Sequence, residues 1–287
     1  MRIGVALPQY DYADNDWATV VAMAKRADRL GLDSAWLADH LFMAVEKYGA
    51  PPGHHFGHDP IVALAHLARA TERIDLGVLV LCAQLRPANV LAHQLTTLRK
   101  LAGEHRNIVP GVGAGWHEPE YVEAGIPFER PGVRLRQMIE VLEVVGAAGF
   151  PKMIGGRGDR LMGLAAEHAD GWNTAWAITP EEYEQKATKL PATVERSLGL
   201  YTLIGEDRRD LERRFRRLQE LTPPGVVDHL TVDQWRTGRL VGTVEEVREQ
   251  VADWENRGVS LIIAGLGALP FSISDPDDLD LLASALL

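Results

Sequence analysis

Short runs of apolar residues alternate along this chain with longer segments whose apolar positions are spaced as on one face of a helix. Residues 74–81 are apolar at all but two positions, which is typical of a strand buried on both faces of a parallel sheet. Residues 16–30 show the helical pattern, with Asp16 in the N-cap position and Gly31 as the C-cap. The two patterns alternate to the end of the chain.

The alternation predicts eight strands separated by helices. The predicted strands cover residues 3–7, 34–37, 74–81, 108–112, 152–154, 170–173, 198–204 and 261–264. The predicted helices cover residues 16–30, 60–70, 87–101, 132–145, 159–168, 180–189, 207–221, 243–257 and 277–286. Residues 41–58 are expected to form a long loop, and residues 222–240 are the least regular segment. This order predicts an α/β fold, a single (β/α)8 TIM barrel over residues 1–287, with any site on the loops that follow the strands.

Composition narrows the classes of function. Lys and Arg number 30 against 40 Asp and Glu, and the formal net charge of −10 argues against a nucleic-acid or anionic membrane surface. The arginine-rich stretch 208–217 also contains acidic residues and predicts a solvated helix face. No apolar run approaches the roughly 20 residues of a membrane span, and the run before Pro8 is too short for a signal peptide. Cys82 is the single cysteine, so no disulfide can form within the chain, and we expect a cytoplasmic protein.

Glycine-rich segments lie at the ends of several predicted strands. Gly111, Gly113 and Gly115 precede Trp116, and the missing Cβ atoms let the backbone approach a flat ring closely. Trp116 would stack on a ligand or close off a pocket. A tight turn beside a core tryptophan is the alternative explanation, because glycine also dominates ordinary turns.

A second glycine-rich segment stands at the start of a predicted helix. The first N–H groups of a helix bind anions, and an arginine adds charge-assisted hydrogen bonds. Gly155, Gly156, Arg157 and Gly158 therefore form a candidate phosphate site. The Lys–Ser/Thr pair of a P-loop is missing, which argues against a nucleotide triphosphatase.

Candidate polar groups follow the second and third predicted strands. Asp39 and His40 come after the second strand, where an imidazole could transfer a proton or hydrogen-bond a bound heterocycle. A histidine that only pairs with Asp39 or caps a helix is the alternative. Cys82 ends the third strand, but no adjacent basic residue lowers the pKa of its thiol, so we expect a wall residue rather than a nucleophile.

Three histidines lie close together in the long predicted loop. His54, His55 and His58 stand beside Asp59, where a zinc or iron site is conceivable. They lack helical ligand spacing, so we expect loop histidines on a mobile lid and no metal site. The sequence also has no Gly-x-Ser-x-Gly segment, and serine hydrolase chemistry has no support.

Several motifs occur in the order found in one known superfamily. They are Ala38–His40, Leu76–Val80, Gly111–Trp116 with Glu120–Tyr121, Gly125–Phe128, Ile154–Gly156, Ala169–Asn173 and Gly242–Val247. On these residues the chain resembles the bacterial luciferase-like monooxygenase superfamily, and within it the probable F-420-dependent oxidoreductases of actinobacteria. The resemblance covers nearly the whole chain and is weakest over residues 206–240.

The resemblance implies a barrel that binds the deazaflavin coenzyme F-420, or alternatively FMN, at the C-terminal rim. It implies a cis peptide bond between Leu79 and Val80 behind the isoalloxazine ring, and His40 as the catalytic residue near the reactive face of that ring. The expected cofactor-binding residues are Asp39, Leu79, Val80, Gly113, Gly155, Gly156, Arg157 and Gly158, and the expected substrate-pocket residues are Trp116 and Trp172.

The expected function is hydride transfer between F-420 and a small organic substrate, with the cofactor carrying the hydride chemistry. An FMN-dependent monooxygenase, which uses O₂ and flavin reduced by a flavin reductase partner, is one alternative. A non-catalytic flavin-binding barrel is another. Trp116 stands where the sugar-phosphate dehydrogenases of the superfamily carry a glutamate acid, so their activity is not expected here. The superfamily often dimerises, which allows a homodimer.

Overall fold

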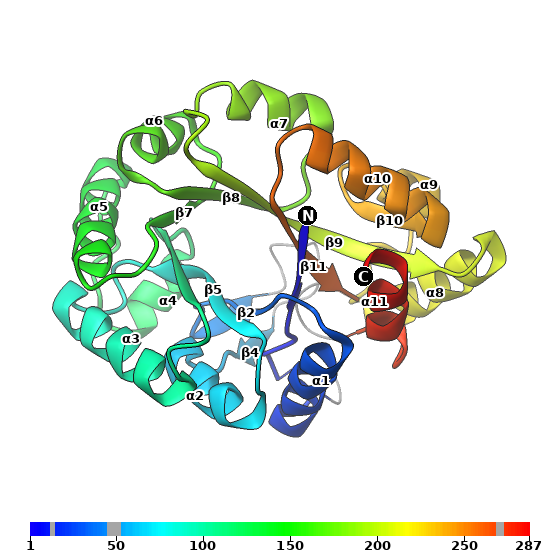
Figure 1. Ribbon diagram of the computed structural model, residues 1–287, viewed down its shortest axis with the longest axis horizontal. Coiled ribbons are helices and arrows are strands. Elements are labelled where there is room, and N and C mark those ends of the chain that lie inside the picture. The colour runs from blue at the N-terminus through cyan, green and yellow to red at the C-terminus, as the bar shows by residue number, and fades with distance from the viewer. Residues whose placement is uncertain (12–14, 45–52, 268–272) are drawn as a thin grey trace.

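The computed structural model describes residues 1–11, 15–44, 53–267 and 273–287 (Figure 1). Its parallel strands pair around a closed ring. In ring order they are β1 (Arg2–Ala6), β2 (Ser34–Leu37), β5 (Asp75–Cys82), β6 (Ile108–Gly113), β7 (Met153–Gly155), β8 (Gly171–Trp176), β9 (Glu195–Gly205) and β11 (Leu261–Leu266), which pairs again with β1. Within the described residues these match the predicted strands, and the TIM barrel is confirmed.

Helices cover the outside of this ring, as Figure 1 shows. They are α1 (Trp17–Leu30), α2 (Pro60–Ala70), α3 (Ala88–Ala102), α5 (Pro131–Ala147), α6 (Asp159–His168), α7 (Pro180–Ala187), α10 (Val244–Asn256) and α11 (Asp278–Leu286). Each lies close to the range predicted from apolar spacing. In the part of the chain that the structure describes, no helix combines the length and apolar character needed to cross a membrane.

Side-chain caps fix helix ends at positions that the sequence indicates. Asp16 accepts the Thr19 N–H at 2.8 Å before α1, and Gly31 ends that helix with a φ of 89°. Thr243 and Glu246 form a capping box at the start of α10. These caps satisfy backbone N–H groups that a helix leaves unpaired, so their residue types mark the boundaries.

Six further elements complete the described fold. They are the antiparallel pair β3 (Phe42–Ala44) and β4 (His54–Phe56), α4 (Glu118–Glu123), α8 (Arg208–Leu221), α9 (Val232–Trp235) and β10 (Leu240–Thr243), which pairs with the outer half of β9. Of these, the arginine-rich sequence predicts α8 alone. The strands β3, β4 and β10 lie in or beside the irregular segments 41–58 and 222–240, where no regular alternation of strands and helices marks them.

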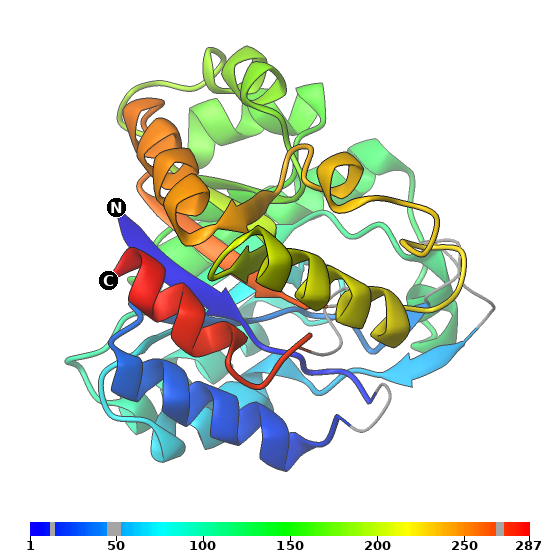
Figure 2. The same cartoon turned by 90° about the vertical axis from the view of Figure 1, so that its right-hand side faces the viewer.

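Helix α8 is not solvated on every side. The other arginines of residues 208–217 are exposed, as expected, but the Arg214 side chain is only 2% exposed. It forms ion pairs at 2.7–2.8 Å with Asp210, Asp277 and Asp278, because α8 passes beside the start of α11 (Figure 2). Burial raises the pKa of the Asp278 carboxyl to about 6 even beside this guanidinium. The prediction of a solvated face is therefore wrong at Arg214.

Trp36 occupies the interior of the barrel. Its side chain is buried, and its indole N–H donates to Ser34 Oγ at 2.8 Å. Glycines on both neighbouring strands make room for the ring: a Cβ atom on Gly77 would lie 2.3 Å from it, and one on Gly4 would lie 2.8 Å from its Nε1. Glycines inside these apolar runs therefore mark close packing rather than weak strands.

Replacing Arg214 by alanine should lower the free energy of unfolding by about 3–5 kcal/mol, because the buried Asp278 loses its counter-charge. The control is Arg217→Ala on the same helix, where the pair with Glu220 is exposed and worth less than about 1 kcal/mol. Denaturant unfolding measures both variants. Equal losses would show that the ion pairs between α8 and α11 do not stabilise this contact.

Replacing Gly77 by alanine should lower the free energy of unfolding by about 1–3 kcal/mol, because the new methyl group overlaps the Trp36 ring. Gly132→Ala is the matched control, since nothing lies within 4 Å of the added Cβ atom. That change in a helix should be neutral or stabilising by up to about 1 kcal/mol. Thermal unfolding with a Gly77→Ala midpoint at or above that of Gly132→Ala would contradict the packing argument.

Candidate functional site

A cavity of about 310 Å³ opens at the carboxyl ends of β2, β5, β6, β7 and β8. In a TIM barrel this rim carries the functional loops. Larger cavities of about 380 and 530 Å³ lie at the opposite mouth of the barrel and beside α8. We assign the site to the rim cavity because His40, Val80, Trp116 and Gly156 all line it, as the sequence predicts for site residues.

Val80 lies at the junction of the glycine-rich strand ends and lines the cavity. A Cβ atom on Gly113 would lie 2.5 Å from Val80 Cγ2, and one on Gly155 would lie 2.4 Å from Val80 Cγ1. The bond between Leu79 and Val80 is cis, as the resemblance implies. The glycines at the ends of β6 and β7 therefore make room first for a side chain of the protein, an explanation that differs from both the ligand contact and the tight turn considered from the sequence.

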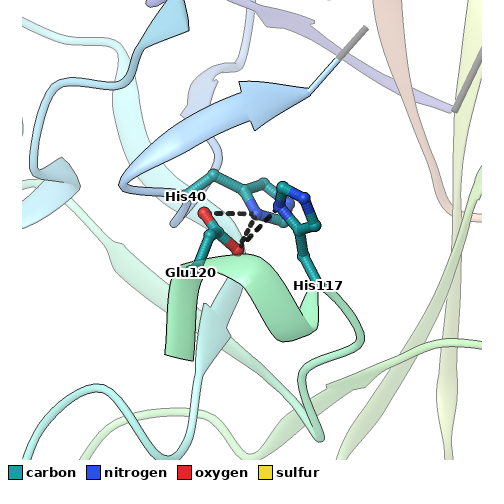
Figure 3. A group of neighbouring side chains, drawn as sticks. All are labelled: His40, His117 and Glu120. Carbon is teal, nitrogen blue, oxygen red and sulfur yellow. Dashed lines mark hydrogen bonds and ion pairs between the residues drawn. The ribbon is translucent and has the colours of Figure 1, made fainter. Parts of the chain in front are cut away.

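His40 lies on the wall of the cavity and contacts Glu120 of α4 (Figure 3). Its Nδ1 atom lies 2.9 and 3.1 Å from the two carboxylate oxygens. The Glu120 side chain is 4% exposed and also accepts the Leu41 N–H at 2.7 Å. His117 Nδ1 lies 3.4 Å from the same carboxylate. His40 thus belongs to a buried polar cluster. In the sequence Glu120 stands out only as part of a motif of the family resemblance, with no role at the site, and His117 does not stand out at all.

Asp39 pairs with Arg86 and not with His40. Its carboxylate accepts two hydrogen bonds from the Arg86 guanidinium, at 2.7 and 2.9 Å, and one from the Cys82 backbone N–H at 2.9 Å. Arg86 also reaches Asp59, the N-cap of α2, at 2.5 Å. The carboxylate of Asp39 therefore joins β2, β5 and α2 at the rim. Its contact with a cofactor stays a prediction.

Cys82 lines the cavity as a half-buried thiol. Its Sγ atom lies 3.0 Å from the Tyr121 hydroxyl, which donates to Gln84 Oε1 at 2.6 Å. Burial raises the pKa of the thiol. A raised pKa keeps the thiol protonated, which is the opposite of nucleophile activation. This environment fits the prediction that Cys82 is a wall residue of the cavity.

The turn between β7 and α6 contains both paired and uncapped groups. Gly155 and Gly156 line the cavity, and the Gly156 N–H already donates to the backbone of β8 at 2.9 Å. Gly158 is the N-cap of α6, and no side chain caps that helix, so its first-turn N–H groups can bind an anion. Arg157 is exposed and pairs with Glu182 at 3.3 Å. Neither Arg157 nor Gly158 is among the residues that line the cavity.

Trp116 lines the cavity and Trp172 does not. The Trp116 side chain is exposed and its ring lies edge-on to His40, 5.4 Å away. Trp172 is fully buried and stacks on Tyr183 of α7. The structure therefore places Trp172 against α7 and outside the lining of this cavity. Side chains alternate along β8, and its neighbour Asn173 faces the cavity instead.

Two further cavity or rim residues carry little signal in the sequence. Trp176 lines the cavity and stacks on Tyr201 at 5.8 Å, and the bond between Ala175 and Trp176 is cis. It lies beyond the predicted end of its strand, so strand-end reasoning stopped short of it. Arg86 follows β5 by four residues and is recognisable only through its carboxylate partners in space.

The three loop histidines do not converge. The side chain of His54 bonds to the Glu123 carboxylate. Those of His55 and His58 bond to the backbone carbonyl groups of Asp11 and Gln9. Among the described residues, donor atoms close enough for a metal ion are found instead around Glu120, within 4.8 Å of one another. The lid predicted for residues 41–58 includes residues 45–52, which lie outside the described part of the chain.

Comparisons with known proteins agree on one protein family. Residues 1–148 match the luciferase-like monooxygenase family. An F-420-dependent glucose-6-phosphate dehydrogenase from Amycolatopsis mediterranei is 31% identical over 149 residues, which are 50% of this chain and 40% of that protein.

Solved structures share the fold over almost the whole chain. An F-420-dependent secondary alcohol dehydrogenase in complex with an F-420–acetone adduct is 17% identical, covers 99% of this chain and 98% of its own, and has a TM-score of 0.73. A monooxygenase from Streptomyces bottropensis is also 17% identical, covers 100% and 98%, and has a TM-score of 0.76. At this identity the likeness shows the fold alone.

The family match and the fold agree with the residues at the rim. The matched segment, residues 1–148, is more than half of the 287-residue chain and contains both His40 and Glu120. The structural likeness extends over the strands that follow. The chain belongs to the luciferase-like monooxygenase family.

Proposed function

We propose that this chain is an oxidoreductase that binds F-420 in the rim cavity and transfers a hydride between the cofactor and a small organic substrate. The observation that carries the proposal is the make-up of the cavity. His40, an apolar surface at Val80 and the turn before α6 all line one space. A proton-transfer group, a surface for a flat ring and a phosphate-binding turn are the parts that such a reaction needs from a protein.

The residues present fit a tricyclic ring with a phosphate-bearing side chain. A volume of about 310 Å³ is within the range of small-molecule sites. Val80, Trp116 and Trp176 supply apolar and aromatic surfaces. The uncapped first turn of α6 supplies N–H groups for a phosphate. FMN has the same two parts, so this fit supports both cofactors.

When bound, the cofactor supplies the hydride chemistry. The residues of the chain do the remaining work in this proposal. Val80 supports one face of the ring, the N–H groups at the start of α6 orient the phosphate, and Trp116 bounds the substrate side beside His40. His40 holds or accepts the proton that moves at the substrate oxygen.

An FMN-dependent monooxygenase that receives reduced flavin from a reductase is the second candidate. The match of residues 1–148 to the luciferase-like monooxygenase family supports it. The F-420-dependent relative at 31% identity favours the first candidate. Parallel fluorescence titrations with F-420 and with FMN separate the two. Binding of F-420 alone supports hydride transfer, binding of FMN alone supports the monooxygenase, and binding of neither at ~100 μM, about 5.5 kcal/mol, contradicts both.

Gly156→Val should weaken F-420 binding at least about tenfold, because a φ of 130° is strained for a residue with a side chain. The new Cβ atom would also lie 3.1 Å from Leu161 Cδ1 at the start of α6. Gly163→Ala on the same helix is the control, since nothing lies within 4 Å of its added Cβ atom. A folded Gly156→Val variant with the dissociation constant of the control would overturn the phosphate assignment.

His40→Ala should lower kcat at least about tenfold while the fold and the F-420 affinity are kept, because proton transfer by a side chain contributes about 10²–10⁴ to a rate. His93→Ala, at an exposed position on α3, is the control. Steady-state kinetics with a substrate found by screening measures the effect. Unchanged turnover in His40→Ala would remove His40 from the mechanism.

A further inference from the structure

We infer that Glu120 is the positioning residue of the site: its carboxylate holds His40 through Nδ1 and so commits Nε2 to proton transfer in the cavity. The inference deepens the proposed function and rests on it for the chemistry. Glu120 belongs to α4 and acts on the substrate through His40.

Glu120 is a buried carboxylate whose hydrogen-bond partners are provided by the residues around it. The side chain is 4% exposed, and a buried carboxylate is costly unless hydrogen-bond donors surround it. Two donors come from one turn of the chain, the His40 Nδ1 group at 2.9 Å and the Leu41 N–H at 2.7 Å. One carboxylate therefore fixes both the backbone after His40 and the orientation of its ring.

The hydrogen bond determines which ring nitrogen carries the proton. An ionised carboxylate can only accept hydrogen bonds, so Nδ1 of His40 must be the donor. In the neutral imidazole the other nitrogen, Nε2, is then the acceptor. Because His40 lines the cavity, this acceptor is available for a hydroxyl group of a substrate.

The proton transfer balances within this pair. As the substrate is oxidised, its O–H bond breaks and an N–H bond forms at Nε2, while the hydride goes to the deazaflavin of the proposed function. The resulting imidazolium has its positive charge beside the carboxylate of Glu120, 2.9 Å from Nδ1. In the reverse direction Nε2 returns the proton to the oxygen of the carbonyl substrate.

A second imidazole approaches the same carboxylate oxygen. His117 Nδ1 lies 3.4 Å from Glu120 Oε2 (Figure 3). The His117 ring also stacks on Trp116, with ring centroids 4.9 Å apart. The three donor atoms are also close enough for a metal ion. The spacing of 2.9 Å between His40 Nδ1 and the carboxylate is that of a charge-assisted hydrogen bond, which can hold His40 on Glu120 without a metal ion.

The test reads the tautomer of His40 directly by long-range ¹H–¹⁵N NMR on protein labelled with ¹⁵N-histidine, with the His40→Gln spectrum to assign its signals. Neutral His40 should carry its proton on Nδ1 in the wild type. Glu120→Gln should shift the proton toward Nε2 and lower kcat at least about tenfold, with KM and the F-420 dissociation constant changed less than about threefold. Glu123→Gln, an exposed position on the same helix, is the control and should change neither.

Three results would overturn the inference. One is a wild-type His40 with its proton on Nε2, which can be read even if the Glu120 variant does not fold. Another is a folded Glu120→Gln variant with unchanged tautomer and kcat. Glu120 would then have only a structural role, as the acceptor of the Leu41 N–H. The third is one equivalent of metal in the purified protein that Glu120→Gln loses. The tautomer needs no cofactor, so a chain with the expected tautomer that binds neither F-420 nor FMN would refute the proposed function and leave the positioning by Glu120 supported.

Discussion

The packing of Val80 against the ends of β6 and β7 is the constraint on which the shape of the site depends. Its two methyl groups occupy the volume that Cβ atoms of Gly113 and Gly155 would take, at 2.5 and 2.4 Å. Any side chain at either position would have to push Val80 into the cavity, since protein interiors leave no room to spare. The glycines thus set the position of an apolar surface, and the ligand space follows from it.

A second constraint holds the opposite wall. The residues on both sides of His40 are each bound by a buried or partly buried charge. Asp39 is tied to Arg86 and to the backbone of β5, and Leu41 donates to Glu120. The backbone around His40 is therefore anchored from two directions, so that its ring can be held by a single further hydrogen bond. This arrangement meets the need of a proton-transfer group for a fixed orientation.

The sequence predicts the barrel well because its strands are apolar runs and its helix ends carry capping residues such as Asp16 and Thr243. These signals are local, and burial in a parallel sheet imposes them directly. The strand ends also locate His40, Val80 and Gly156 at one rim, because all parallel strands deliver their carboxyl ends to the same side. That geometric rule explains why most of the residues singled out in the sequence line the same cavity.

The rest depends on tertiary contacts that no local pattern shows. Glu118, Glu120 and Glu123 share one short helix, and only the position of β2 decides that Glu120 is the buried one. In the sequence Arg214 cannot be distinguished from the neighbouring arginines of α8, because its burial results from its contact with Asp278 of α11. Trp172 is the aromatic residue that the sequence places at the end of its predicted strand. Because side chains alternate between the two faces of a strand, it points toward α7 and not into the cavity.

The two constraints give the two halves of the cavity different chemical character, one apolar and one polar. Strands β5, β6 and β7 give an apolar surface without polar groups that would distinguish one tricyclic ring from another, so this half does not discriminate between the two proposed cofactors. The half formed by β2 and α4 gives a proton acceptor backed by a buried carboxylate. A fixed proton acceptor has a direct use when a hydride leaves a carbon that carries a hydroxyl group, because the proton of that group must leave with it. The polar half of the cavity therefore argues for hydride transfer more strongly than the apolar half argues for either cofactor.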